Sequence, residues 1–368
     1  MTRRLNLAAA LMVACGLGCD DRVECRKGSS EGGGPACQQE NAEPLVRGEA
    51  PPGFPAGPLG GLGPADNVLT EARAQLGKRL FFETRLSRDN TVSCGTCHQQ
   101  RYAFAEPTAV STGVDQRQGT RNAPALVNLA WGESFFWDGR ARTLEDQAGG
   151  PIENPLEMDL KLPVAVDRLR GDDSYVKQFQ EAYGDGPSEE TLRKALASFV
   201  RTLVSGDSPY DRFLRDGESS AFDEKARAGE ALFFSERTAC FHCHPPGALT
   251  NEGFFNDGSF VVGLDAGRQA ITGRSGDLGK FKVPGLRNIA VTAPYMHDGS
   301  LATLDQVLDR YDRGGLGHPS TDPQIQPLAL TPDDREALLA FLNALTDPTF
   351  LSDSRFQTRA PDILPSLR

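Results

Sequence analysis

The chain has 368 residues, of which 24% are charged and 39% hydrophobic, and its formal net charge at pH 7 is −11. That length is enough for about two domains, each with a hydrophobic core. The acidic balance argues against binding to nucleic acids and to anionic membrane surfaces, because both are negatively charged.

The first 18 residues have the pattern of an export signal. Two arginines precede a mostly apolar run that is too short to span a bilayer. The run ends at Cys15 and Cys19, each after a small residue, as in bacterial lipoprotein signals. We therefore predict a periplasmic or cell-envelope protein with a lipid anchor; an ordinary cleaved signal is the alternative. Cysteine parity favours Cys19, because Cys25 and Cys37 then remain to form a disulfide outside the cytoplasm.

Residues 19–65 are rich in glycine and proline, and three consecutive glycines occur at 32–34. A segment of this composition has little apolar surface to bury, so it cannot offset the entropy lost on folding. We predict a disordered tether between the anchor and the folded part of the chain.

The folded part is expected to begin at Asp66. The spacing of apolar residues predicts one helix over 70–82, capped by its first threonine, and another over 188–204. Between them, residues 120–127 are expected to form a turn and a short helix, and residues 149–158 a loop.

The pattern C-x-x-C-H occurs twice, and it predicts two covalently bound haem c groups. Two thiols three residues apart can form thioethers to the two vinyl groups of one porphyrin, and the adjacent imidazole can then ligate the iron. A redox pair or a zinc site is the alternative, but zinc requires further nearby ligands. The predicted attachment residues are Cys94, Cys97 and His98 in the first copy and Cys240, Cys243 and His244 in the second.

Other patterns recur in the same order. The pattern G-x-x-L-F-F-x-x-R is found at 77–85 and 229–237, and D-G-x-x-x-T-L at 138–144 and 298–304. We therefore predict a mainly α fold with two tandem cytochrome c-like helical haem domains that arose by internal duplication. Their expected bounds are 66–206 for the first domain and 207–350 for the second, with a tail over 351–368.

The positions of histidine and methionine restrict the iron ligands. Between Gln99 and Ala239 the sequence has no histidine, and its only methionine is Met158. The iron beside His98 therefore has no obvious sixth ligand nearby, unless Met158 or a residue of the other half fills that position. A five-coordinate iron can bind peroxide, whereas a six-coordinate iron mainly transfers electrons. The candidate sixth ligands of the second iron are Met296, His297, Tyr311 and His318.

Taken together, these motifs resemble those of the bacterial di-haem cytochrome c peroxidases, a family that includes MauG. The resemblance covers about residues 69–345. It is carried by the strings SCGTCH, TRNAPALVN, FFWDGRARTLEDQ, GPIENPLEM, CFHCH, VPGLRN and TAPYMHDGSLATL.

The resemblance implies roles for several residues. Trp137 would lie between the two haems and relay electrons. Glu157 would be the distal acid–base group of the first haem, and Gln147 and Pro151 match other positions of that pocket. The resemblance also implies a calcium ion, which prefers oxygen ligands. Its ligands would be the side chain of Asn122 and the backbone carbonyls of Thr292 and Pro294.

Two positions depart from the better-known peroxidases. Those enzymes carry a histidine in the loop after the first C-x-x-C-H, which blocks the peroxide-binding haem until reduction. Here Val114 stands at that place, in the loop 111–118. Tyr311 matches the position of their second-haem methionine, as in MauG, and Met296 would then be a neighbour of the iron. Both departures imply an enzyme that reacts with peroxide without prior reduction.

The sequence therefore predicts a peroxidase that reduces hydrogen peroxide with electrons from a small cytochrome c or a cupredoxin. One alternative is a MauG-like oxidase that uses peroxide to modify residues of a partner protein, which Tyr311 and Val114 favour. Another alternative is a di-haem electron carrier without substrate chemistry, for which both irons would be six-coordinate.

Overall fold

The computed structural model of the protein describes residues 23–25, 37–39, 43–217, 220, 222–259 and 265–357. The chain divides into a short unit over Met1–Glu43 and a body over Pro44–Arg368. The predicted signal segment, with Cys15 and Cys19, lies outside the described residues. Within those residues, no helix combines the length and the hydrophobicity that crossing a membrane requires.

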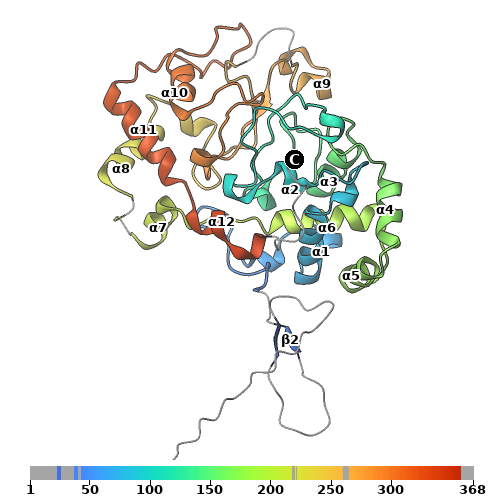
Figure 1. Ribbon diagram of the computed structural model, residues 1–368. Coiled ribbons are helices and arrows are strands. Elements are labelled where there is room, and N and C mark those ends of the chain that lie inside the picture. The colour runs from blue at the N-terminus through green and yellow to red at the C-terminus, as the bar shows by residue number, and fades with distance from the viewer. Residues whose placement is uncertain are drawn as a thin grey trace, which may run out of the picture. The chain divides into compact units, whose positions relative to one another are not determined.

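The short unit contains two strands, β1 (Val23–Cys25) and β2 (Cys37–Gln39), of which Figure 1 labels the second. The strands are antiparallel, and their register places Cys25 opposite Cys37. Directly opposed residues of antiparallel strands have the backbone separation that a disulfide needs. The disulfide between these two cysteines stays a prediction.

The body is mainly helical, which confirms the predicted fold class (Figure 1). The body also contains a pair of two-residue antiparallel strands, β3 (Phe254–Phe255) and β4 (Phe281–Lys282). The helices are α1 (Glu71–Phe81), α2 (Cys94–Cys97), α3 (Leu144–Glu153), α4 (Leu162–Arg170), α5 (Asp173–Tyr183), α6 (Glu189–Arg201), α7 (Pro209–Asp216), α8 (Glu224–Phe233), α9 (Gln269–Thr272), α10 (Leu304–Asp312), α11 (Pro332–Ala344) and α12 (Pro348–Ser352).

Helices α1 and α6 pack together in the first half of the body, residues 44–206. Both begin where the sequence predicts. The Thr70 side chain accepts a hydrogen bond from the third residue of α1, and Ser188 forms a capping box at α6. The helices approach closely at Gly77, where an added Cβ would lie 1.9 Å from the carbonyl oxygen of Ala195. Glycine is required at this crossing.

The second half, residues 207–347, repeats this arrangement with α8 and α11. A Cβ added to Gly229 would lie 1.9 Å from the carbonyl oxygen of Ala337. Gly77 and Gly229 occupy the same place in the repeated sequence pattern. Matching helix pairs that cross at matching glycines support the predicted duplication.

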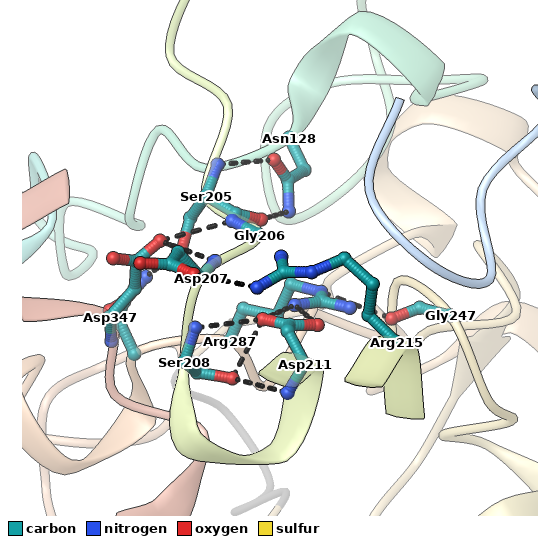
Figure 2. Close-up of polar contacts among 11 residues, drawn as sticks. Asn128, Ser205, Gly206, Asp207, Ser208, Asp211, Arg215, Gly247, Arg287 and Asp347 are labelled. Atoms are coloured by element: carbon teal, nitrogen blue, oxygen red, sulfur yellow. Dashed lines mark hydrogen bonds and ion pairs between the residues drawn. The ribbon is translucent and has the colours of Figure 1, made fainter. Parts of the chain in front are cut away.

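A buried carboxylate, Asp347, joins the two halves (Figure 2). One of its oxygens accepts hydrogen bonds from the Ser205 hydroxyl and from the backbone N–H groups of Gly206 and Asp207, each at 3.0 Å. Its own N–H donates to the side chain of Asn288. These bonds satisfy the buried side chain and fix the segment that connects the halves.

The structure differs from the sequence prediction at both ends of the body. Residues 44–65, predicted as part of a disordered tether, pack on the first half. Leu45 and Leu59 are buried there, and the Glu71 carboxylate accepts from the N–H of Leu45. Beyond Pro348 the chain forms α12 and a turn that buries Phe356, although no periodicity predicted this.

Two local predictions in the first half were also wrong. Residues 120–127 contain no helix, and the first five residues of the predicted loop 149–158 belong to α3. Pro151 lies in the last turn of that helix, so its missing N–H removes one hydrogen bond close to the helix end. The bounds of the two haem domains stay a prediction.

Replacement of Gly77 by alanine tests the close helix crossing. Alanine favours a helix by roughly 1 kcal/mol over glycine, but here the added methyl group would meet a backbone carbonyl that cannot turn away. We therefore expect Gly77→Ala to lower the free energy of unfolding by about 1–3 kcal/mol in denaturant titrations. Gly186→Ala, at a position with open space, is the control. A Gly77→Ala protein as stable as this control would contradict the packing described.

Candidate active site

A cavity of about 1290 Å³ lies in the first half of the body and extends to the second half. Its wall brings together residues that the sequence places far apart. Those assigned to the first haem and its surroundings all line it: Cys94, Cys97, His98, Asn122, Trp137, Gln147, Pro151 and Glu157.

The proximal side of the cavity is built on α2 and the loop after it. His98 follows α2 directly, and its Nδ1 lies 2.6 Å from the carbonyl oxygen of Phe104. That bond leaves Nε2 as the nitrogen available for a metal. Burial lowers the pKa of His98, which keeps the imidazole neutral, as ligation requires.

The two thiols of this segment are half-buried and unpaired. Burial raises the pKa of Cys94 and of Cys97 to about 12, so both are neutral thiols. Two unpaired thiols and a neutral imidazole beside a large cavity fit a covalently attached haem.

A second site of the same kind lies in the second half. The thiols of Cys240 and Cys243 are unpaired, and His244 Nδ1 lies 2.7 Å from the carbonyl oxygen of Leu249. Burial lowers the pKa of His244 to about 4. Burial raises the pKa of the half-buried Tyr311 phenol well above its usual value, and the phenol lies near both thiols.

A comparison of α3 with α10 favours Tyr311 as the second-haem ligand. The two helices start at equivalent threonine caps, Thr143 and Thr303. Pro151 and Tyr311 each lie eight residues after the cap. If both helices face their haems in the same way, Tyr311 would direct its phenol at the second haem. Pro151 would occupy the equivalent position at the first haem. Proline has no side-chain atom that can bind iron.

The other candidate ligands have different surroundings. The ring of His297 stacks on Phe281 at 3.7 Å, in the wall of the first cavity. His318 bonds to the hydroxyl of Ser320 at 2.7 Å. His242 lies within the attachment segment, is exposed, and lies 3.3 Å from Glu236.

Glu157 is the carboxyl group of the cavity wall that lies near the attachment cysteines. It follows α3 in a turn, and its Oε1 accepts a hydrogen bond of 2.6 Å from the side chain of Asn154. Burial raises the pKa of Glu157, while Asn154 and the nearby charge of Arg140 act in the opposite direction. The carboxyl lies close enough to the thiols of Cys94 and Cys97 to influence their pKa values. It is therefore a titratable group beside the predicted haem.

The loop 111–118 forms part of the same wall and is held in place by the turn that carries Glu157. Val114 is buried, and its N–H donates to the Glu157 carbonyl oxygen at 2.9 Å. At the rim, Arg88 pairs with Asp115 and, at 3.0 Å, with Asp159. The loop thus places an apolar side chain, and no imidazole, at position 114.

Trp137 lies where the two halves meet. Its indole N–H donates to the carbonyl oxygen of Asn122 at 2.8 Å, and the Asn122 N–H donates to the carbonyl oxygen of His297 at 2.8 Å. The Lys282 N–H donates to the carbonyl oxygen of Trp137. The tryptophan is therefore bonded to both halves.

The side chain of Asn122 has one oxygen left for a further partner. Its amide nitrogen donates to the carbonyl oxygens of Thr108 and Ala109, which fixes the orientation of the side chain. Across the described ranges, no cluster of histidine, cysteine, aspartate or glutamate could hold a metal ion. The oxygens of Asn122, Thr292 and Pro294 suit calcium in kind, and the calcium ion stays a prediction.

Two residues of the site were not identified from the motifs. Asn154 lies inside the string GPIENPLEM, but its contact with Glu157 depends on the turn after α3. Phe104 orients His98 through its backbone carbonyl. Because every residue has a backbone carbonyl, the residue type does not indicate which one accepts the bond.

Comparisons with known proteins agree with this geometry. The family described as di-haem cytochrome c peroxidase matches residues 71–219. The chain is 37% identical to the methylamine utilization protein MauG of Methylorubrum extorquens, with 92% of this chain and 94% of that protein covered. It is 33% identical to the cytochrome c551 peroxidase of Pseudomonas aeruginosa, with 76% and 80% covered.

Two solved structures are also similar. A MauG-like protein associated with microbial copper homeostasis matches with a TM-score of 0.78 and 33% sequence identity, over 83% of this chain and 97% of that one. The di-haem peroxidase BthA of Burkholderia thailandensis matches with a TM-score of 0.69 over 83% and 96% of the two chains. At 20% identity, BthA supports the fold alone.

Proposed function

We propose that the protein reduces hydrogen peroxide to water in the cavity beside His98. The reason is that the chain belongs to the di-haem cytochrome c peroxidase family and is a haem oxidoreductase. The observation that carries this proposal is Glu157. A half-buried carboxyl with a raised pKa, held by Asn154 beside the attachment cysteines, is suited to proton transfer at this place.

The chain's own residues supply the proton chemistry. Reduction of one peroxide to two waters consumes two electrons and two protons. Bound haem supplies the iron position for peroxide and part of the redox capacity. Glu157 accepts a proton from the peroxide oxygen nearest the iron and returns it to the departing oxygen. Such general acid–base catalysis typically contributes ~10²–10⁴-fold. Gln147 and Pro151, on the same face of α3, shape the pocket for peroxide.

Electrons would enter through the second haem. Tyr311, or alternatively Met296, would ligate that iron, and Trp137 would relay electrons to the first haem across the junction. The donor would be a small cytochrome c or a cupredoxin. Calcium at Asn122, Thr292 and Pro294 would stabilise the junction.

A second candidate function is that of a MauG-like oxidase, which would use peroxide to modify residues of a partner protein. The half-buried phenol of Tyr311, near the second attachment site, and the buried, apolar Val114 favour this role. The similarity to MauG over nearly the whole chain also favours it. For either role we propose a location outside the cytoplasm, with a lipid anchor at Cys19 or Cys15.

The reaction of the fully ferric protein with peroxide separates an ungated enzyme from a gated one. Because Val114 cannot ligate iron, we expect the absorption spectrum to change when peroxide is added without any reductant. Rapid turnover with a reduced small cytochrome c or cupredoxin then supports the peroxidase, and slow turnover with all such donors supports the oxidase. Reactivity only after partial reduction would contradict the ungated site.

The variant Glu157→Gln tests the acid–base role. We expect the second-order rate constant with peroxide to fall by ~10²–10⁴-fold. In the wild type the rate should decrease as the pH falls through the raised pKa of Glu157, because a protonated carboxyl cannot accept a proton. This pH dependence should be absent from the variant.

Stopped-flow measurements over a pH series check both expectations. Glu153→Gln, at a half-exposed carboxylate of α3, is the control. An unchanged rate and pH profile in Glu157→Gln would exclude this residue as the acid–base group.

A further inference from the structure

The C-terminal segment, residues 348–357, leaves the second half and packs on the first. Its two phenylalanines, Phe350 and Phe356, are buried in the hydrophobic core of the first half. Figure 1 shows this segment in red, where it continues from α11 towards α6 and α1. The first half therefore contains a piece of chain that follows the whole second half in sequence.

Both ends of the segment are fixed by hydrogen bonds. At its start, Asp347 caps α12 by accepting from the N–H of Phe350 at 2.9 Å, and its other oxygen holds the linker between the halves (Figure 2). Near its end, the Lys78 ammonium donates to the carbonyl oxygen of Arg355 at 2.6 Å. The segment is thus a defined part of the fold.

The segment contacts the loop that orients His98. The ring of Phe104 lies 5.9 Å from that of Phe350 and 6.2 Å from that of Phe356, measured between centroids. Gln100, two residues after His98, donates its side-chain amide to the carbonyl oxygens of Phe350 and Asp353, each at 2.9 Å. The segment therefore holds this loop at two points.

The loop needs such support because its backbone is strained. Ala103 and Phe104 have φ values of 54° and 58°, in the left-handed region that residues other than glycine rarely adopt. Such conformations persist only where the surrounding structure determines them. The carbonyl of Phe104 accepts the hydrogen bond from His98, so whatever fixes Phe104 also fixes the direction of that acceptor.

The corresponding loop of the second half is supported differently. Leu249, whose carbonyl accepts from His244, also has a positive φ, of 54°. There the guanidinium of Arg287 donates to the carbonyl oxygen of Gly247 at 3.1 Å, and Asp211 of the same half holds Arg287 (Figure 2). That loop also packs closely on Gly53 of the first half, and Arg287 lies over the ring of Phe54. The loop of the first half is held instead by a segment that follows the second half in sequence.

We propose that the C-terminal segment is a positioning element for His98, which acts through the backbone carbonyl of Phe104. The hydrogen bond from Nδ1 to that carbonyl orients the imidazole and increases its basicity as a ligand. A more basic proximal ligand stabilises the higher charge of ferric iron and so lowers the reduction potential of the first haem. This proposal rests on the proposed function in one respect, which is that the first haem is the one that reacts with peroxide.

Two variants of the full-length, haem-loaded protein test this inference. Phe356→Leu removes ring contacts to Phe104, and Gln100→Met removes two hydrogen bonds at nearly constant volume. Phe179→Leu is the control, because Phe179 is fully buried in the same core but outside the aromatic cluster around Phe104. The reduction potential of each haem is measured by spectroelectrochemistry, and amide hydrogen exchange is measured over residues 99–105.

We expect both variants to raise the potential of the first haem, to leave that of the second unchanged, and to accelerate exchange in the loop. The rate of the peroxide reaction should fall by about 10-fold or more, as for other groups that support a metal ligand. If Phe356→Leu does not retain haem, the result of Gln100→Met decides.

Unchanged potentials, equal shifts of both haems, or the same shift in Phe179→Leu would overturn the inference. A wild-type protein that does not react with peroxide would reject the proposed function. A selective shift of the first potential would still support the positioning role in that case.

Discussion

A hydrogen bond from a half-buried histidine to a backbone carbonyl organises each attachment site. His98 bonds to Phe104, and His244 bonds to Leu249. Each bond fixes which nitrogen remains for iron, and burial keeps both rings neutral, as the lowered pKa values of the two histidines indicate. Both acceptors lie at positive φ, so each loop must be held by the packing around it. The helix pairs α1–α6 and α8–α11 supply much of that packing.

The two halves share this framework and differ in what they place around it. At equivalent positions of α3 and α10 the first half carries Pro151 and the second carries Tyr311. The first half also has a turn that places Glu157 beside the attachment cysteines. We propose that this difference suits one repeated unit to proton chemistry at an open iron position and the other to ligation of iron on both sides. Trp137, bonded to both halves, connects them.

Local signals in the sequence predicted the parts of the fold that depend on local contacts. Caps at Thr70 and Ser188 located α1 and α6, and C-x-x-C-H located the attachment sites. The residues of the cavity wall followed from the resemblance to a known family, and the structure brings them together. Their individual roles are proposals, because side-chain placement alone does not test chemistry.

The features that the sequence did not reveal depend on contacts between distant residues. Leu45 lies in a stretch poor in apolar residues, but it packs in the core of the first half, where its N–H donates to the Glu71 carboxylate. Phe350 and Phe356 follow no periodic pattern and are buried by Phe104, which lies about 250 residues earlier in the chain. Pro151 and the preceding glycines predicted a loop, yet packing keeps them in α3.

We propose that one haem of the two is open to an added ligand. Titration of the fully ferric protein with cyanide, followed by absorption spectroscopy, counts such positions directly. We expect one equivalent of cyanide to bind per chain, at the haem beside His98, without any reductant. Binding of no cyanide would mean that both irons are already six-coordinate and would contradict the claim. Binding of two equivalents would contradict the assignment of a protein ligand to the second haem.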